Sequence, residues 1–285
     1  MRHAGSGRPP GRLHNHDERQ GEVRRMDDPS VWDRVLEMLR SASSGAPSFP
    51  PTVLYNENWM LRVVLDALVS GGTSSEAIPV TEGARWYSEA LLPSAFLARV
   101  RGDPLAESYT HADGVIGQFQ IGGVGKGDLV LDPNAKQLSV IEGKMLSGLS
   151  RGVKNAKYFD QAARNVACVA EVLRIAECPP ERLEQVSFHV LAPRRQIESG
   201  VFEDLVTKES IAWKVEHRVE EFQGARDEWL AEWFRPTLDA MDVGLVSWEE
   251  LVEEIAGRDA EFGGDLEAFY HKCLRFNAST GWVAS

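Results

Sequence analysis

The chain has 285 residues, of which 43% are hydrophobic and 26% are charged, and its formal net charge is -12. This length and apolar content fit one large globular domain, or a core domain with additions, and the lack of any run of about 18 apolar residues excludes a membrane-spanning helix. Because the N-terminus has no signal-peptide segment and the three cysteines lie far apart, we expect a reduced cytoplasmic protein.

The negative charge is unevenly distributed along the chain. Residues 203–267 contain 19 acidic and 6 basic residues, a local balance of -13, whereas residues 144–164 contain five basic residues and one acidic residue. Phosphate contacts need local positive charge and not a basic protein as a whole. A nucleic-acid partner is therefore compatible with the segment 144–164, while the acidic C-terminal third should weaken nonspecific binding to duplex DNA.

Residues 1–25 are rich in Gly, Pro and Arg and poor in apolar residues, which predicts a disordered basic tail. This tail is either a genuine basic arm that touches phosphates or an artefact of a start site upstream of Met26. The apolar spacing and the turn residues then predict, in chain order, a helix at about 27–42, a loop at 43–52, a helix at 56–69 and a further helix at 81–91.

Beyond residue 113 the pattern changes to short apolar runs typical of strands, with helices after them. The expected strands are 115–121, 127–131, 138–145, 186–191 and 210–215, and the expected helices are about 153–176, 219–240, 247–256 and 264–275. Strands that are followed by a long helix and a further strand predict an α/β fold with a central mixed sheet flanked by helices. We expect this core over 26–200 and an acidic, mainly helical C-terminal extension over 201–285 packed on it.

The candidate chemistry lies in two consecutive strands that a short turn should join into a hairpin. Alternate residues of a strand share a face, so Glu142 and Lys144 should point the same way at the end of an otherwise apolar strand. The hairpin should bring Asp128 alongside Glu142. Buried charges are costly unless they pair or bind a metal, so we expect these side chains to pair with one another or to bind a metal.

Two carboxylates and an ammonium at one strand end suit phosphodiester cleavage. Asp128 and Glu142, with the backbone carbonyl of Gly143, would bind Mg²⁺ or Mn²⁺, which keeps several waters and accepts phosphate oxygens. The metal would activate water, and Lys144 would orient that water, serve as base or stabilise the transition state. The alternative is that Glu142 and Lys144 form an ordinary surface ion pair on an edge strand and that Asp128 starts a turn.

Asp128, thirteen intervening residues and then Glu142-Gly143-Lys144 resemble the signature of the PD-(D/E)XK nuclease superfamily, which includes restriction enzymes and nucleases of recombination and repair. The resemblance covers roughly residues 55–195. It implies a restriction-endonuclease-like core, in which the first carboxylate precedes a hairpin that ends in Glu-X-Lys. The sequence departs from the pattern in that Gly127 stands where Pro precedes the first acidic residue.

The resemblance also implies supporting residues. In many such nucleases the first helix of the core carries a Glu that completes the metal shell, and Glu57 holds a comparable place, although a Glu in a first turn also favours the helix dipole. Some members have a Gln on the helix after the Lys, which is Gln161 here. By the helical repeat, Gln161 and Asn165 share a polar stripe that faces either the site or water.

Lys154, Lys157 and Arg164 are candidates for contacts with nucleic acid, with solvated side chains as the alternative. His111 and Asp113 precede a glycine, a pattern more typical of a turn than of a metal pair. The eight tryptophans show no ladder spacing, which favours core positions over base-stacking platforms.

The sequence thus predicts a Mg²⁺-dependent nuclease with Asp128, Glu142, Lys144 and Gln161 as catalytic residues. DNA is favoured over RNA on the resemblance alone, and restriction, phage defence and repair are compatible settings. The alternative is a catalytically inactive nucleic-acid-binding or protein-interaction module on the same fold. A homodimer, or a protein partner encoded in the same operon, is also compatible with the sequence.

Overall fold

The computed structural model describes residues 29–71, 75–98, 100–122, 127–152 and 156–278. The tail predicted over 1–25 and the candidate residue Lys154 lie outside these ranges. Among the helices of the described residues, none is both long enough and apolar enough to cross a membrane.

A five-stranded mixed sheet forms the centre of the fold, with the order β1-β2-β5-β6-β7. Its first three strands are antiparallel neighbours, whereas β5, β6 and β7 run parallel. Strands β3 and β4 form a second, two-stranded antiparallel sheet. The strand bounds are β1 Arg85–Leu92, β2 Thr110–Gly117, β3 Phe119–Ile121, β4 Leu129–Leu131, β5 Gln137–Gly143, β6 Gln185–Ala192 and β7 Asp242–Ser247.

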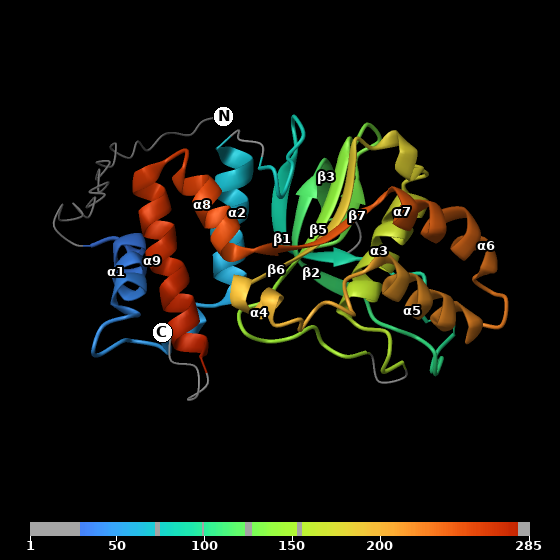
Figure 1. Ribbon diagram of the computed structural model, residues 1–285, viewed down its shortest axis with the longest axis horizontal. Coiled ribbons are helices and arrows are strands. Elements are labelled where there is room, and N and C mark those ends of the chain that lie inside the picture. Colours follow the sequence, from blue (N-terminus) through green and yellow to red (C-terminus); the bar gives the residue numbers. More distant parts are fainter. Residues whose placement is uncertain (1–28, 72–74, 99, 123–126, 153–155, 279–285) are drawn as a thin grey trace, which may run out of the picture.

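Helices cover both faces of this sheet (Figure 1). One face carries α2, α8 and α9, with α1 beyond them, and the other carries α3 with α5, α6 and α7. The helix bounds are α1 Val31–Ser41, α2 Glu57–Ser70, α3 Gln161–Ile175, α4 Arg194–Glu198, α5 Lys208–Glu220, α6 Asp227–Trp229, α7 Arg235–Ala240, α8 Trp248–Ala256 and α9 Ala260–Asn277, with short turns η1 Pro51–Val53 and η2 Pro180–Arg182 and the π-helical η3 Leu230–Phe234. The predicted α/β class with a mixed sheet flanked by helices is confirmed.

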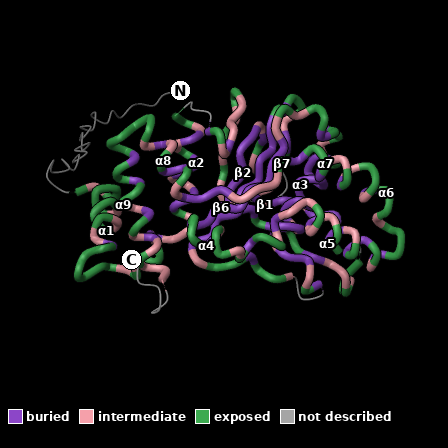
Figure 2. Tube along the Cα trace, in the orientation of Figure 1, coloured by how far each residue is buried: buried purple, intermediate pink, exposed green. Residues whose placement is uncertain are grey.

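The central strands are buried on both faces, as Figure 2 shows by their colour. All seven residues of β5 are buried, and they alternate between the two cores: Val140 packs toward α3, while Ile141 packs toward α2. Burial on both faces explains why this strand is apolar with no simple alternation. It also means that Glu142, which follows the apolar residues of β5, lies in a buried part of the strand.

Two predicted elements have the wrong type of secondary structure. The segment 81–91, expected as a helix, contains β1, because its backbone pairs with β2 from Arg85↔Gly117 to Leu92↔Thr110. The segment 210–215, expected as a strand, lies within α5, where Thr207 caps the first turn and Ile211, Val215 and Val219 are buried at helical spacing. In both cases tertiary contacts outweigh the intrinsic preference of a short segment.

The predicted hairpin between the strands 127–131 and 138–145 does not form. Instead β4 pairs with β3, and β5 pairs with β2. Gly117, at the end of β2, lies so close to β5 that a Cβ atom there would be 2.1 Å from the carbonyl oxygen of Gln137. The absence of a side chain at Gly117 therefore allows β2 and β5 to meet directly, and the chain between them leaves the sheet as the separate β3–β4 hairpin.

The C-terminal third contributes to the central sheet. Strand β7, which the sequence did not reveal, pairs in parallel with β6 from Ser187↔Asp242 to Ala192↔Ser247. The Trp248 side chain that follows it is fully buried in the core on the α2 side. The division expected at residue 200 therefore separates residues that belong to one sheet.

Candidate active site

The register of β2 and β5 brings two carboxyl groups together. Gly114 pairs with Ile141, so Asp113 on β2 faces Glu142 on β5. The Asp113 carboxylate accepts a hydrogen bond from the backbone N–H of Gly143 at 3.0 Å, and the Glu142 carboxyl group lies next to it. An aspartate and a glutamate from neighbouring strands thus share one small polar space at the end of an apolar strand pair.

Glu142 is the centre of a dense hydrogen-bond network, although its side chain is only 1% exposed. Its Oε1 atom accepts from Lys144 Nζ at 2.6 Å and from Gln161 Nε2 at 2.7 Å. Its Oε2 atom accepts from Asn165 Nδ2 at 3.1 Å. Lys144 is itself buried, so this pair is not the exposed surface ion pair that was the alternative to a functional site.

Two carboxyl groups that lie this close together repel each other when both are ionised. Burial, and then the charge of Glu142, raise the pKa of Asp113 to about 7, against the opposing effects of Lys144 and of the Gly143 N–H. Near neutral pH, therefore, Asp113 exchanges between a protonated and an ionised form, and a cation that enters the site favours the ionised form.

Helix α3 positions the two amide side chains. Asp160 caps its first turn by accepting from the backbone N–H of Ala163, and the buried Lys214 of α5 donates to the other carboxylate oxygen at 2.7 Å. The amide of Gln161 is held at both ends, because its Oε1 accepts from the backbone N–H of Ser150 at 2.8 Å while its Nε2 reaches Glu142. The amide orientation is therefore set before any ligand arrives.

The end of β5 is held by residues from later in the chain. The backbone N–H of Lys144 donates to the carbonyl of Leu191 on β6, and the indole N–H of Trp248 donates to the carbonyl of Lys144, both at 2.8 Å. These two bonds fix the backbone on either side of the Lys144 side chain, which leaves the ammonium directed at Glu142.

Asp128 does not take the place expected for it beside Glu142. It bridges to Leu91 on the outer side of β1, so β1 and β2 lie between it and β5. With neighbouring strands about 4.8 Å apart, this arrangement separates the two backbones by about 14 Å. The reason is the strand pairing described above, which joins β5 to β2 and carries β4 away to the edge.

Glu57 and Gly143 meet on the other face of the strand. A Cβ atom built on Gly143 would lie 3.7 Å from the Cβ of Glu57, so this glutamate at the start of α2 approaches β5 on the α2 face. The Glu142 side chain points to α3 on the opposite face. What Gly143 contributes directly is its backbone N–H to Asp113.

The two described candidates for phosphate contacts, Lys157 and Arg164, differ in their exposure and in their contacts. Lys157 is exposed just before α3. Arg164 turns inward, where it donates to Thr110 Oγ1 at 3.2 Å, and its charge acts on the buried Glu107. A role for Arg164 in gripping phosphate is therefore not supported by its contacts.

Sequence reasoning missed Asp113 as the partner of Glu142. The signal was present, since an acidic residue preceded the glycine at the start of a strand pattern, but that glycine is typical of a turn as well. The predicted polar stripe of α3 does face the site through Gln161 and Asn165. Asn165 Oδ1 is buried without a hydrogen-bond partner, which leaves one unused oxygen acceptor next to the carboxylates.

The donor set fits a hard divalent cation. Within the described ranges no three or more His, Cys, Asp or Glu side chains are grouped so as to hold a metal. Mg²⁺, however, is commonly held by one or two carboxylates together with waters and substrate oxygens, and Asp113 and Glu142 supply two. Such an ion would neutralise the negative charge that the carboxyl pair carries when Asp113 is ionised.

Comparisons with known proteins find no counterpart: no family model, no curated protein and no solved structure matches this chain.

Proposed function

We propose that this protein is a divalent-cation-dependent nuclease with Asp113, Glu142 and Lys144 at its centre. The observation that carries the proposal is the meeting of the buried Glu142 carboxyl group with the partly buried Asp113 carboxyl group, with the Lys144 ammonium 2.6 Å from Glu142. Buried charges that are not fully compensated are costly, so they mark functional sites more often than structural ones.

The resemblance to the PD-(D/E)XK superfamily is supported better with Asp113 than with Asp128 as the first acidic residue. Asp113 stands on one strand of an antiparallel pair, and Glu142-Gly143-Lys144 ends the other strand. Ala112 precedes Asp113, which is again a departure from the Pro of the family pattern. The order of a helix, three antiparallel strands, a helix and a parallel strand in the core is compatible with a restriction-endonuclease-like sheet.

Asp113 and Glu142 would hold Mg²⁺ or Mn²⁺, which when bound supplies a polarised water and shields charge on the phosphate. Gln161 and Asn165 keep the Glu142 carboxylate in one orientation through their amide N–H groups. Lys144 offers a positive charge next to the same carboxylate, where it stabilises the anionic transition state of phosphodiester hydrolysis. In this reaction water adds to phosphorus and one P–O ester bond breaks, with a proton going to the leaving oxygen.

The test is cleavage of plasmid and single-stranded DNA, and of RNA, by the full chain in the presence of Mg²⁺ or Mn²⁺. The variants Asp113→Asn and Lys144→Ala should each lower the rate by at least about a hundredfold, since each removes a group that acts in the transition state. A well-folded wild type that cleaves none of these substrates with either metal would contradict the proposal.

A second function is a non-catalytic nucleic-acid-binding or protein-interaction module on this fold. The observation in its favour is that, in the described part of the chain, two carboxylates and not three or more converge at the site. Binding of DNA without cleavage, unchanged in Asp113→Asn, would favour this second function.

A further inference from the structure

Three aromatic rings form an open cluster beside the candidate active site: Tyr158, just before α3, and Trp213 and His217 of α5. The Trp213 and His217 rings are stacked, with centroids 5.5 Å apart and an interplanar angle of 13°. Tyr158 meets them at 4.6 Å from His217 and 5.9 Å from Trp213. Trp213 is 57% exposed, so a large flat surface faces solvent and is not used by the fold.

The cluster is rigid because its supports are buried. Trp213 and His217 lie one helical turn apart, and the next residues along α5, Lys214 and Arg218, are anchored inside the protein. Lys214 holds Asp160, while Arg218 pairs with Glu107 at 3.1 Å. A pre-ordered ring loses little entropy when a ligand stacks on it.

The hydroxyl group of Tyr158 is also fixed. It donates to Glu221 Oε1 at 2.8 Å, which holds the ring of Tyr158 against the other two. Burial and this glutamate raise the pKa of Tyr158, so the ring stays uncharged. Tyr158 and His217 are thus each held by a contact with a glutamate, Glu221 at 2.8 Å and Glu220 at 3.1 Å.

The cluster lies close to the proposed catalytic carboxylates. Tyr158 precedes Gln161, which contacts Glu142, by three residues, and three residues span at most about 11 Å. Trp213 adjoins Lys214, the partner of the α3 cap residue. The cluster and the contact of Gln161 with Glu142 therefore lie at the same end of α3.

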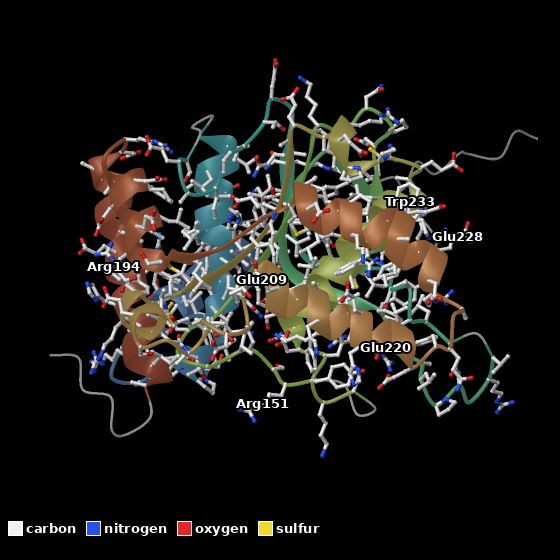
Figure 3. All side chains as sticks on the ribbon, turned by 45° about the vertical axis from the view of Figure 1, so that its right-hand side comes forward. Arg151, Arg194, Glu209, Glu220, Glu228 and Trp233 are labelled. Carbon is white, nitrogen blue, oxygen red and sulfur yellow. The ribbon has the colours of Figure 1, made fainter. Side chains whose placement is uncertain are left out.

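Exposed cationic side chains lie in the segment that carries Tyr158. Arg151 and Lys157 are both exposed in the segment that leads into α3, and Figure 3 shows Arg151 below α5, with Glu209 and Glu220 marking the two ends of that helix. Of the acidic side chains on α5, Glu216 pairs with Arg235, whereas the exposed Glu209 and Glu220 add negative charge beside the cluster.

We propose that Tyr158, Trp213 and His217 form a stacking platform for an unpaired nucleobase, so that the substrate is nucleic acid with a single-stranded segment next to the cleaved phosphate. This inference deepens the proposed function and rests on it for the position of the phosphate. Aromatic faces bind bases of any sequence, because every base has a π-face, and cationic side chains beside them take the phosphates. The expectation that the tryptophans occupy core positions is wrong for Trp32, Trp59 and Trp213, which are exposed.

The experiment measures binding without cleavage, by fluorescence anisotropy in EDTA. The probes are a labelled single-stranded oligothymidylate of about ten nucleotides and an abasic strand of the same length and charge. Trp213→Ala should weaken binding of the oligothymidylate by between about fivefold and about a hundredfold and should leave binding of the abasic strand unchanged. Trp213→Phe, which keeps an aromatic face, should restore most of the lost affinity.

Trp32→Ala is the matched control, because Trp32 on α1 is 76% exposed and lies away from α5. It should bind both probes as the wild type does. The platform is refuted if wild type fails to bind the oligothymidylate, if Trp213→Ala has no effect, or if it weakens both probes equally. Cleavage that persists unchanged in Trp213→Ala would refute the platform and leave the nuclease. If the protein cleaves nothing but binds the oligothymidylate in a way that depends on Trp213, the nuclease is refuted and the platform is kept.

Discussion

Asp113 and Gly143 are joined across two strands by a hydrogen bond of 3.0 Å from the glycine N–H to the aspartate carboxylate. Because this glycine separates the other two charged residues of the site, the bond holds the β2 carboxyl group directly against them. The bond depends on the register of β2 and β5, so it ties the chemistry of the site to the pairing of the central strands.

Replacing Asp113 with Asn should stabilise the fold at neutral pH and above. The folded-state pKa of Asp113, about 7, lies above its ordinary value of 3.8, so the stabilisation from its bound proton is fully present below about pH 3.8 and is lost as pH rises to about 7. Asn is uncharged and keeps an acceptor for the Gly143 N–H. Urea unfolding at about pH 8 should therefore give a free energy of unfolding higher than that of the wild type by on the order of 2 kcal/mol.

The same comparison at about pH 4 is its control, because the wild-type carboxyl group is then protonated in the folded state and the difference should shrink toward zero. A variant that is less stable than the wild type at pH 8 would show that the ionised carboxylate is favourably solvated in the fold.

Asp113 and Asp128 should differ sharply in their effect on cleavage. Asp113→Asn removes a carboxylate in contact with Glu142, whereas Asp128→Asn changes a residue on the outer side of β1. We expect the first variant to lose at least about a hundredfold in kcat/KM and the second to lose less than about tenfold. The measurement is kcat/KM of both variants and of the wild type on one DNA substrate. A larger loss in Asp128→Asn than in Asp113→Asn would favour the hairpin that the sequence alone suggested.

Divalent cations should raise the melting temperature of the wild type above about pH 7, where the carboxyl pair is most strongly charged. An ion that binds only the folded state, at a hundred times its Kd, adds about 2.7 kcal/mol of stability. For a protein of this size that corresponds to a rise of roughly 5–10 °C. The rise in melting temperature is measured by thermal unfolding in MgCl₂ and in MnCl₂, each compared with NaCl of equal ionic strength.

The rise should be absent in Asp113→Asn, since that variant lacks one of the two carboxylates that would hold the ion. An equal rise in the variant would locate the bound cation elsewhere on the protein.

Lys214→Met should be strongly destabilising. It leaves the buried Asp160 carboxylate without its cationic partner, and breaking such a pair costs about 3–5 kcal/mol. Asp160 also caps α3, so the start of the helix that carries Gln161 should loosen. Denaturant unfolding measures the loss of stability, and hydrogen exchange of the first turn of α3 measures the loosening.

The double variant Lys214→Met, Asp160→Asn distinguishes a lost charge pair from a lost cap. Asn still accepts from the Ala163 N–H and carries no charge, so most of the lost stability should return. If the double variant is as unstable as Lys214→Met alone, the lysine acts through packing and not through the charge of Asp160.

Much of this protein follows from the sequence by itself. The apolar runs determine an α/β fold with a buried central strand, and the alternation of side chains along that strand puts Glu142 and Lys144 on one face. The helical repeat of α3 likewise gathers Gln161 and Asn165 on the side that reaches Glu142. These are local properties, because each depends on residues only a few positions apart in the chain.

Only the tertiary structure decided which aspartate lies beside Glu142 and which strand pairs with β5 on that side. Asp113 lies 29 positions before Glu142 in the numbering of the chain, and the two meet because Gly117 lets the β2 backbone approach β5. The addition of β7 after residue 241 and the exposure of Trp213 are decided in the same way. Strand pairing is set by backbone hydrogen bonds between segments distant in sequence, and short patterns of residue types do not record which partner a strand will take.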